Sequence, residues 1–201
     1  MKTFIWDLDG TLINSYPVIL KSLEETFEHF EIPCEIEEVR KEVLNQSVVS
    51  LLKQTSANYN VHYEELKILF SEKSRSKNKE IKLMDGTLDA LEWTVEKGIK
   101  NYIYTHKSNN AFKILSRLKI EEFFSEVVTS SNGFQRKPHS EGIDYLIDKY
   151  QLEKDNIYYI GDRRLDVEIA VNAGTKSINL TQPSSEINVN ISKLADIYAL
   201  I

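Results

Sequence analysis

Residues 4–12 read FIWDLDGTL, an apolar run that ends in two aspartates separated by one leucine. Positions i and i+2 of a strand point to the same side, so we expect Asp7 and Asp9 to point together just beyond the strand. Open parallel sheets bind their ligands at the carboxyl ends of the strands. Neighbouring carboxylates repel each other unless one is protonated or a cation bridges them. The stretch predicts such a ligand site, and the alternative is a capping turn with two solvated acids.

The composition is that of an ordinary globular protein. The chain has 201 residues, 41% of them hydrophobic and 28% charged, enough for one domain or one domain with a smaller insert. The net charge of -6 argues against a nucleic-acid partner but allows a small phosphorylated one. We expect no signal peptide and no membrane partner, because two aspartates interrupt the N-terminal apolar run and no run is long enough to span a bilayer. The expected location is the cytoplasm.

Short apolar runs alternate with helical patterns along most of the chain. The strand-like runs cover residues 3–6, 101–105, 126–129, 157–160 and 176–180. Apolar residues between them recur at helical spacing, at Leu88, Leu91 and Val95, at Phe112, Leu115 and Leu118, at Ile143, Leu146, Ile147 and Tyr150, and at Val167, Ala170 and Val171. Runs without polar alternation are typical of parallel strands covered on both faces. The alternation predicts an α/β fold with a Rossmann-like doubly wound parallel sheet.

The segment 14–80 has a different pattern, with no convincing strand. Its apolar residues form four stripes with helical spacing. We therefore expect an all-helical subdomain at 14–80, inserted after the first strand of an α/β core domain that comprises 1–13 and 81–201.

Three further stretches carry polar residues at or near predicted strand ends. Thr105 ends the run 101–105, where its hydroxyl and the adjacent backbone amides can hold an anion. Lys137 lies in a loop ahead of a helical pattern, where an ordinary surface lysine is the alternative. Asp162 and Asp166 follow the run 157–160 and share a face if the turn between them is helical. Together with the first stretch, these positions gather acids, a hydroxyl and a cation at one edge of the sheet.

The order and spacing of these stretches resemble the four motifs of the haloacid dehalogenase superfamily of phosphohydrolases. DLDGT (7–11) is similar to the first motif, Thr105 to the second, Lys137 to the third and GDRRLD (161–166) to the fourth. The resemblance covers residue 3 to about residue 180. The position of the helical insert resembles that of the C1-cap branch, which includes phosphoglycolate phosphatase and beta-phosphoglucomutase.

The resemblance implies a Mg²⁺-dependent phosphatase that acts on a small phosphorylated metabolite. Asp7 would be the nucleophile and form an aspartyl-phosphate. Asp9 would protonate the leaving alcohol and then serve as the base for water. Mg²⁺ would bind Asp7, the backbone carbonyl of Asp9, and Asp162. The acid at Asp9 also favours phosphoryl transfer over dehalogenation, because dehalogenases of the superfamily do not keep the second acid.

The resemblance also implies roles for the residues around these acids. Thr105 and Lys137 would bind the transferring phosphoryl group, and Asp166 would hold a metal-bound water or orient Lys137. His106 stands where many relatives carry asparagine, and we expect it at the rim of the phosphate site rather than as a catalytic base.

The substrate and the exact reaction stay open at the level of sequence. The loop LNQSV (44–48) offers Asn45, Gln46 and Ser47, which either form a simple helix–helix turn or select a hydroxylated or amide-bearing leaving group over an anionic one. A phosphomutase acting on a sugar phosphate is one alternative, although it would have a positively charged cap loop. A non-catalytic regulatory protein on the same fold is another, although it would lose Asp7 or Asp162. Monomer and homodimer are both compatible with the sequence.

Overall fold

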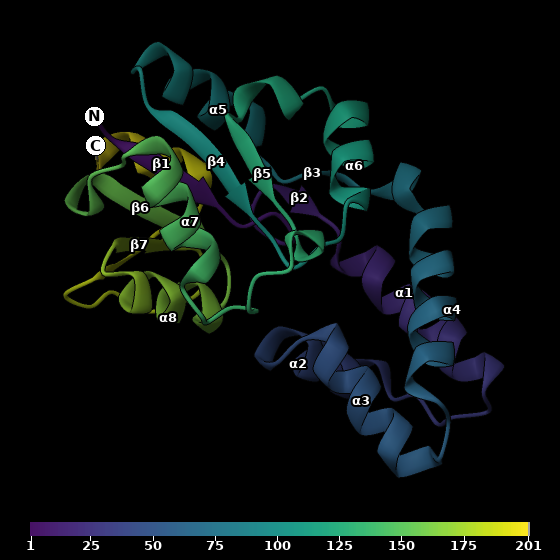
Figure 1. The fold of residues 1–201 in the computed structure, drawn as a ribbon. Helices are drawn as coiled ribbons and strands as arrows, with labels where there is room; N and C mark the ends of the chain where they lie inside the picture. Colours follow the sequence, from purple (N-terminus) through teal and green to yellow (C-terminus); the bar gives the residue numbers. More distant parts are fainter. Residues whose placement is uncertain (201) are drawn as a thin grey trace. The chain divides into compact units, whose positions relative to one another are not determined.

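The chain divides into two compact units in the computed structural model, which describes residues 1–200 (Figure 1). Residues 1–14 and the chain from Lys82 onward form an α/β unit, and residues 15–81 form a helical unit. These boundaries differ by one residue from those expected from the sequence. The short strands β2 (Ile13–Asn14) and β3 (Lys82–Leu83) pair antiparallel where the two connections between the units leave the α/β unit.

A six-stranded parallel sheet forms the α/β unit, with strand order β5-β4-β1-β6-β7-β8. The strands are β1 (Thr3–Trp6), β4 (Lys100–Tyr104), β5 (Glu126–Val128), β6 (Ile157–Gly161), β7 (Lys176–Asn179) and β8 (Asn188–Asn190). The predicted doubly wound parallel sheet is confirmed. The sequence analysis missed β8, because its residues Asn-Val-Asn are polar and lie at the edge of the sheet.

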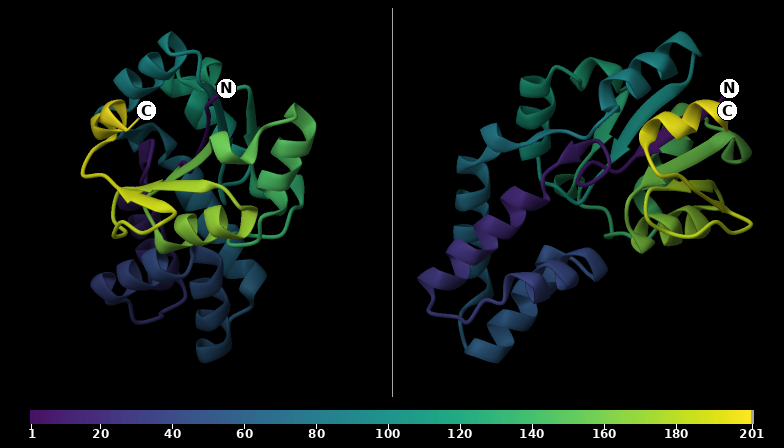
Figure 2. Two further views of the ribbon diagram at one scale, coloured as in Figure 1. Left: turned by 90° about the vertical axis from the view of Figure 1, so that its left-hand side faces the viewer. Right: turned by 180° about the vertical axis from the view of Figure 1, so that it is seen from behind.

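Helices cover both faces of the sheet (Figures 1 and 2). One face carries α5 (Thr87–Glu96) and α6 (Asn110–Leu118), and the other carries α7 (Glu141–Tyr150) and α8 (Arg164–Ala173). Short 3₁₀ helices lie at η2 (Glu121–Phe123), η3 (Ser130–Asn132), η4 (Lys154–Asn156) and η5 (Leu194–Ala199). Burial on both faces explains why the strand segments are apolar without alternation.

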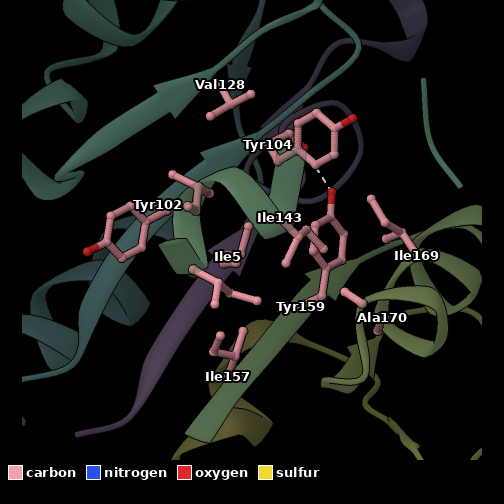
Figure 3. Packing of buried hydrophobic residues seen from close by; sticks show 12 residues of the cluster. Ile5, Tyr102, Tyr104, Val128, Ile143, Ile157, Tyr159, Ile169 and Ala170 are labelled. Carbon is pink, nitrogen blue, oxygen red and sulfur yellow. Dashed lines mark hydrogen bonds between the residues drawn. The ribbon is translucent and has the colours of Figure 1, made fainter. Parts of the chain in front are cut away.

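The packing of α7 and α8 on the sheet is tight (Figure 3). Ile143 of α7 and Ile169 of α8 belong to one buried cluster with residues of β1, β4, β5 and β6. The Tyr159 hydroxyl within this cluster donates a hydrogen bond to the Tyr104 carbonyl oxygen at 2.8 Å. A Cβ atom at Gly142 would lie 2.6 Å from the Tyr104 ring. Glycine at this position therefore lets α7 approach the sheet closely.

The buried face of α5 differs from the face expected from the sequence. Leu88 and Val95 are exposed, as are Phe112 of α6 and Val171 of α8, although all four belong to predicted apolar stripes. The buried residues of α5 are Thr87, Ala90, Leu91 and Thr94. Threonine can occupy the buried face because its hydroxyl finds a carbonyl acceptor, as Thr87 does with Leu12 at 3.0 Å. A pattern that counts only apolar residues therefore predicted the burial of Leu91 correctly but was wrong for Leu88 and Val95.

A chain of buried hydrogen bonds links β1, β4 and α5. The Trp6 Nε1–H group donates to Asn101 Oδ1 at 2.9 Å, and Asn101 Nδ2 donates to Thr94 Oγ1 at 2.6 Å. Thr94 Oγ1 in turn donates to the Leu91 carbonyl oxygen at 2.6 Å. All of these side chains are buried, so each polar group depends on its neighbour in the chain.

The helical unit consists of α1 (Tyr16–His29), α2 (Ile36–Asn45), α3 (Val48–Tyr59), α4 (Tyr63–Ser76) and the short η1 (Asn78–Glu80). The helices correspond to the apolar stripes expected from the sequence. Buried residues of α1 to α4, together with Ile32 from the α1–α2 connection, form one core of Ile19, Leu23, Phe27, Ile32, Val39, Val43, Leu51, Leu52 and Leu66. Across residues 1–200, no helix combines the length and apolar character that crossing a membrane requires.

We predict that Asn101→Leu lowers the free energy of unfolding by about 1–3 kcal/mol, because it leaves the buried Trp6 indole N–H without an acceptor. Urea unfolding monitored by tryptophan fluorescence measures this change. The neighbouring Lys100 is exposed, so Lys100→Ala serves as the control and should change the value by less than about 0.5 kcal/mol. Equal effects of the two variants would contradict a structural role for the hydrogen-bond chain.

Candidate active site

Five polar side chains converge at the carboxyl ends of the central strands. Asp7 follows β1, Thr105 follows β4, and Asp162 follows β6. Asp166 lies in the first turn of α8, and Lys137 lies in the loop ahead of α7. All five are buried, with exposed fractions between 0% and 7%. The Asp7 backbone N–H donates to the Ile160 carbonyl oxygen at 2.8 Å, so strand pairing continues into the site.

Lys137 lies between two of the buried carboxylates. Its Nζ atom is 2.8 Å from Asp7 Oδ1 and 2.9 Å from Asp166 Oδ1. Burial disfavours the ammonium form, yet the charges of Asp166 and Asp7 outweigh burial and raise the pKa of Lys137 above its ordinary value. Burial raises the pKa of Asp7, and the Lys137 ammonium opposes that rise. Lys137 is therefore favoured as a cation and partly offsets a cluster of acids.

Asp166 is held by more than Lys137. Its Oδ2 atom accepts hydrogen bonds from the backbone N–H groups of Arg163 at 3.0 Å and Asp162 at 3.3 Å. A Cβ atom at Gly161 would collide with the Asp166 side chain, so glycine makes room for the carboxylate to fold back against the chain. Both carboxylate oxygens of Asp166 are thus engaged by the protein. This arrangement suits the expected role of orienting Lys137.

The acids of the site fit a divalent cation. Oxygens of Asp7, Asp162 and Asp166 lie within 4.8 Å of one another, and all three residues are buried. Asp7 Oδ2 is also buried, and no group among residues 1–200 donates a hydrogen bond to it. A buried carboxylate oxygen without a donor is costly, and a cation would satisfy it. An all-oxygen donor set without thiol or imidazole is the kind that Mg²⁺ prefers.

His106 connects the loop after β4 to the loop that carries Lys137. Its Nε2 atom accepts a hydrogen bond from the Lys137 backbone N–H at 2.9 Å, which assigns the ring proton to Nδ1. Burial, with the nearby charges of Lys137, Arg136 and Arg163, holds the pKa of His106 far below its ordinary value. The ring is therefore neutral. The sequence analysis placed His106 at the rim of the phosphate site. It did not predict the hydrogen bond to Lys137, because the two residues are 31 positions apart.

Asp9 forms an ion pair with a second lysine, Lys107. Its Oδ1 atom lies 2.9 Å from Lys107 Nζ, and the two side chains are 19% and 11% exposed. Asp9 is thus more accessible than Asp7, which is 1% exposed. The Lys107 backbone N–H donates to Thr105 Oγ1 at 3.1 Å, so the lysine directly follows the turn that Thr105 organises. The sequence analysis assigned no role to Lys107, and its only signal was its place beside the second motif.

The loop at Asn45–Ser47 belongs to the helical unit, where α2 ends and α3 begins. Gln46 Nε2 donates to Glu42 Oε2 at 2.6 Å, and Gln46 Oε1 accepts from Ser50 Oγ at 2.6 Å. Ser47 Oγ accepts from the Ser50 backbone N–H at 3.0 Å and so caps α3. These bonds are those of a helix–helix turn. Selection of the substrate by Asn45, Gln46 and Ser47 stays a prediction.

Most of the chain is similar in sequence to known proteins. The family model described as haloacid dehalogenase-like hydrolase matches residues 4–180, a span that contains all the site residues described above. Pyrophosphatase PpaX of Listeria innocua is 28% identical over 179 residues, which cover 87% of this chain and 81% of that protein. Phosphoglycolate phosphatase 1 of Pseudomonas aeruginosa is 25% identical over 189 residues, which cover 90% of this chain and 69% of that protein.

The fold itself is similar to solved structures. A crystal structure of a HAD-superfamily hydrolase of subfamily IA from Geobacter sulfurreducens matches with a TM-score of 0.77, covering 100% of this chain and 96% of that one. The sequence identity is 19%, so this likeness concerns the fold alone.

The neutral, half-buried His106 predicts a pH dependence of stability. Its folded pKa lies far below the unfolded value of about 6.5, so the unfolded chain binds the extra proton as the pH falls and stability is lost below that value. Between pH 7.5 and pH 5.0 this group should cost about 2 kcal/mol. We expect His106→Asn to flatten the pH profile of unfolding free energy over that range and to leave the slope unchanged above pH 8. Parallel profiles at acidic pH would contradict the prediction.

Proposed function

This chain belongs to the haloacid dehalogenase-like hydrolases, and on that premise we propose that it is a Mg²⁺-dependent phosphatase that hydrolyses a small phosphate monoester through an aspartyl-phosphate on Asp7. The observation that carries the proposal is the buried Asp7 carboxylate, with Lys137 on one oxygen and no hydrogen-bond donor from residues 1–200 on the other. Two relatives that bear phosphatase names support the reaction class.

In the first step Asp7 attacks phosphorus. A bond forms between a carboxylate oxygen of Asp7 and the phosphorus, and the bond from phosphorus to the leaving oxygen breaks. The Lys137 ammonium, 2.8 Å from Asp7 Oδ1, favours the ionised nucleophile and attracts the phosphoryl oxygens on which charge accumulates. The Thr105 hydroxyl, at the end of β4, donates to the same group.

Asp9 handles the proton in both steps. It gives a proton to the leaving oxygen in the first step, so that an alcohol departs. In the second step it takes a proton from the water that attacks the aspartyl-phosphate, which releases inorganic phosphate and regenerates Asp7. Asp9 is the more accessible of the two acids of the first motif, as a group that exchanges protons with substrate and water must be.

The remaining acids would bind Mg²⁺ or position Lys137. Asp7 and Asp162, with the backbone carbonyl of Asp9, would hold Mg²⁺, whose positive charge offsets the repulsion between a carboxylate nucleophile and a phosphate dianion. Asp166 positions Lys137, because one of its oxygens contacts Nζ and the other is fixed by backbone N–H groups.

The two alternatives have less support. A phosphomutase is not among the relatives named above, and the loop at 44–48 carries no positive charge. A non-catalytic protein would have no need to keep Asp7 and Asp162, both of which are present and buried.

We expect the purified protein to hydrolyse 4-nitrophenyl phosphate in the presence of Mg²⁺, to lose this activity in excess EDTA, and to regain it when Mg²⁺ is restored. Asp7→Asn should abolish turnover while keeping the fold, because asparagine still offers Lys137 an acceptor and removes one charge from a crowded acidic cluster. The exposed Asp89 provides the control, and Asp89→Asn should retain the wild-type rate. Activity that survives chelation, or turnover by Asp7→Asn, would refute the proposal.

Lys137→Ala should lower kcat for the same aryl phosphate by about a hundredfold or more, because a cation aimed at developing charge is lost. It should also lower stability, since Asp7 and Asp166 lose their buried partner. The exposed Lys149 forms an ion pair with Glu126, which is not among the site residues. Lys149→Ala is therefore a matched control for the removal of a paired lysine. A Lys137→Ala variant that is destabilised yet keeps its kcat would assign Lys137 a purely structural role.

A further inference from the structure

We propose that Tyr104 and Tyr159 are positioning residues for the reaction, and that the faces of their rings hold the Lys137 ammonium group where it can bind the transferring phosphoryl group. This inference rests on the proposed function, which assigns that contact to Lys137. It extends the function to two residues that the sequence analysis included only in the apolar runs 101–105 and 157–160.

The Lys137 ammonium group lies over two aromatic rings. Its Nζ atom is 5.1 Å from the centroid of the Tyr159 ring and 5.7 Å from that of the Tyr104 ring. Both distances are within the range of about 6 Å over which the face of an aromatic ring attracts a cation. This attraction is strongest where water is excluded, and Lys137, Tyr104 and Tyr159 are all buried. The rings therefore stabilise a buried cation together with the carboxylates of Asp7 and Asp166.

An aromatic face suits this position because it attracts the ammonium group without supplying a strong acceptor atom. The group has three N–H donors. Asp7 Oδ1 at 2.8 Å and Asp166 Oδ1 at 2.9 Å accept two of them. A third carboxylate would occupy the remaining donor, whereas a ring face is a weak acceptor that a phosphoryl oxygen can replace. The rings thus restrict the position of Nζ and leave one donor for the substrate.

The two rings are fixed by strands on either side of β1. Tyr104 ends β4 and Tyr159 lies in β6, and both strands pair with β1, which Asp7 follows. The hydrogen bond from the Tyr159 hydroxyl to the Tyr104 carbonyl oxygen joins them (Figure 3). Burial raises the pKa of Tyr159 well above its ordinary value, so this hydroxyl remains a donor. The close approach of Gly142 to the Tyr104 ring fixes the second ring as well.

Tyr104 also holds the loop that carries Lys137. Its hydroxyl donates to the Gln135 carbonyl oxygen at 3.0 Å, two residues before Lys137. His106 accepts the Lys137 backbone N–H at 2.9 Å. The residues on both sides of Thr105 are thus bonded to the same loop, so the end of β4 positions both the backbone and the ammonium group of Lys137. A cation fixed in this way stabilises developing charge without reorganising during the reaction.

The test separates the ring of Tyr159 from its hydroxyl. Tyr159→Phe keeps the ring and Tyr159→Leu removes it, so kcat for 4-nitrophenyl phosphate should be about tenfold lower in Tyr159→Leu than in Tyr159→Phe. KM should change less, because the charge on the phosphoryl oxygens grows in the transition state. Tyr158 of the same strand is half-buried, and its ring centroid lies 5.3 Å from Lys176 Nζ. Tyr158→Phe and Tyr158→Leu are the matched control and should differ by less than about twofold.

An effect that acts through Lys137 must disappear when Lys137 is removed. In the Lys137→Ala background, Tyr159→Phe and Tyr159→Leu should have equal kcat values. A difference that survives in that background, equal kcat values when Lys137 is present, or an equal loss at Tyr158 would each overturn the inference.

Fluorination tests the ring face if Tyr159→Leu does not fold. Phenylalanine and its trifluorinated analogue at position 159 have nearly the same shape, but fluorine withdraws the negative charge of the ring face that attracts the cation. The fluorinated ring should lower kcat when Lys137 is present and leave it unchanged in Lys137→Ala. Equal kcat values for the two rings in the presence of Lys137 would overturn the inference.

A nuclear magnetic resonance measurement distinguishes failure of this inference from failure of the proposed function. The buried Lys137 ammonium group should give a proton–nitrogen signal that is shielded by the two rings and is identified by its loss in Lys137→Ala. We expect this signal to move downfield in Tyr159→Leu and to stay in place in Tyr158→Leu. That result would support the inference even if 4-nitrophenyl phosphate were not hydrolysed. A signal that is unchanged in Tyr159→Leu would overturn it even if hydrolysis were normal.

Discussion

The buried triad in which Lys137 holds Asp7 at 2.8 Å and Asp166 at 2.9 Å is the constraint on which the rest of the site depends. Charges removed from water are tolerated only when they are paired and hydrogen-bonded. The α/β unit supplies these conditions from several elements: β1 positions Asp7, the turn at Gly161 makes room for Asp166, and His106 fixes the backbone of Lys137. Each of these features has a structural reason before any ligand is considered.

The two acids of the first motif work under different electrostatic conditions. Asp7 is buried and shares its lysine with a third carboxylate, whereas Asp9 is partly exposed and has Lys107 to itself. The difference arises because the chain turns sharply after Leu8, whose carbonyl oxygen accepts hydrogen bonds from several backbone N–H groups of the turn. Two neighbouring carboxylates thereby differ in burial and in pairing, and the mechanism we propose assigns attack on phosphorus to the buried one and proton transfer to the accessible one.

Sequence reasoning was strongest where a single segment carries its own signal. The apolar runs that became β1, β4 and β6, and the stripes that became the helices of the insert, needed no knowledge of distant residues. It failed where burial depends on partners, as at α5, whose buried face contains two threonines with satisfied hydroxyls. The pairs His106–Lys137 and Lys107–Asp9 were also out of reach, because nothing in either segment specifies which distant side chain it meets.

The pairing of β2 with β3 determines how the helical insert can be replaced. Asn14 pairs with Lys82 and Ile13 with Leu83, so the chain leaves the α/β unit and returns to it on adjacent antiparallel strands. Paired strands are about 5 Å apart, whatever the length of the segment that joins them. The insert is thus joined to the α/β unit at two neighbouring strand ends with a fixed spacing. A foreign helical hairpin or a short glycine-rich linker with closely spaced ends could be grafted there, since all six strands of the parallel sheet lie outside the insert.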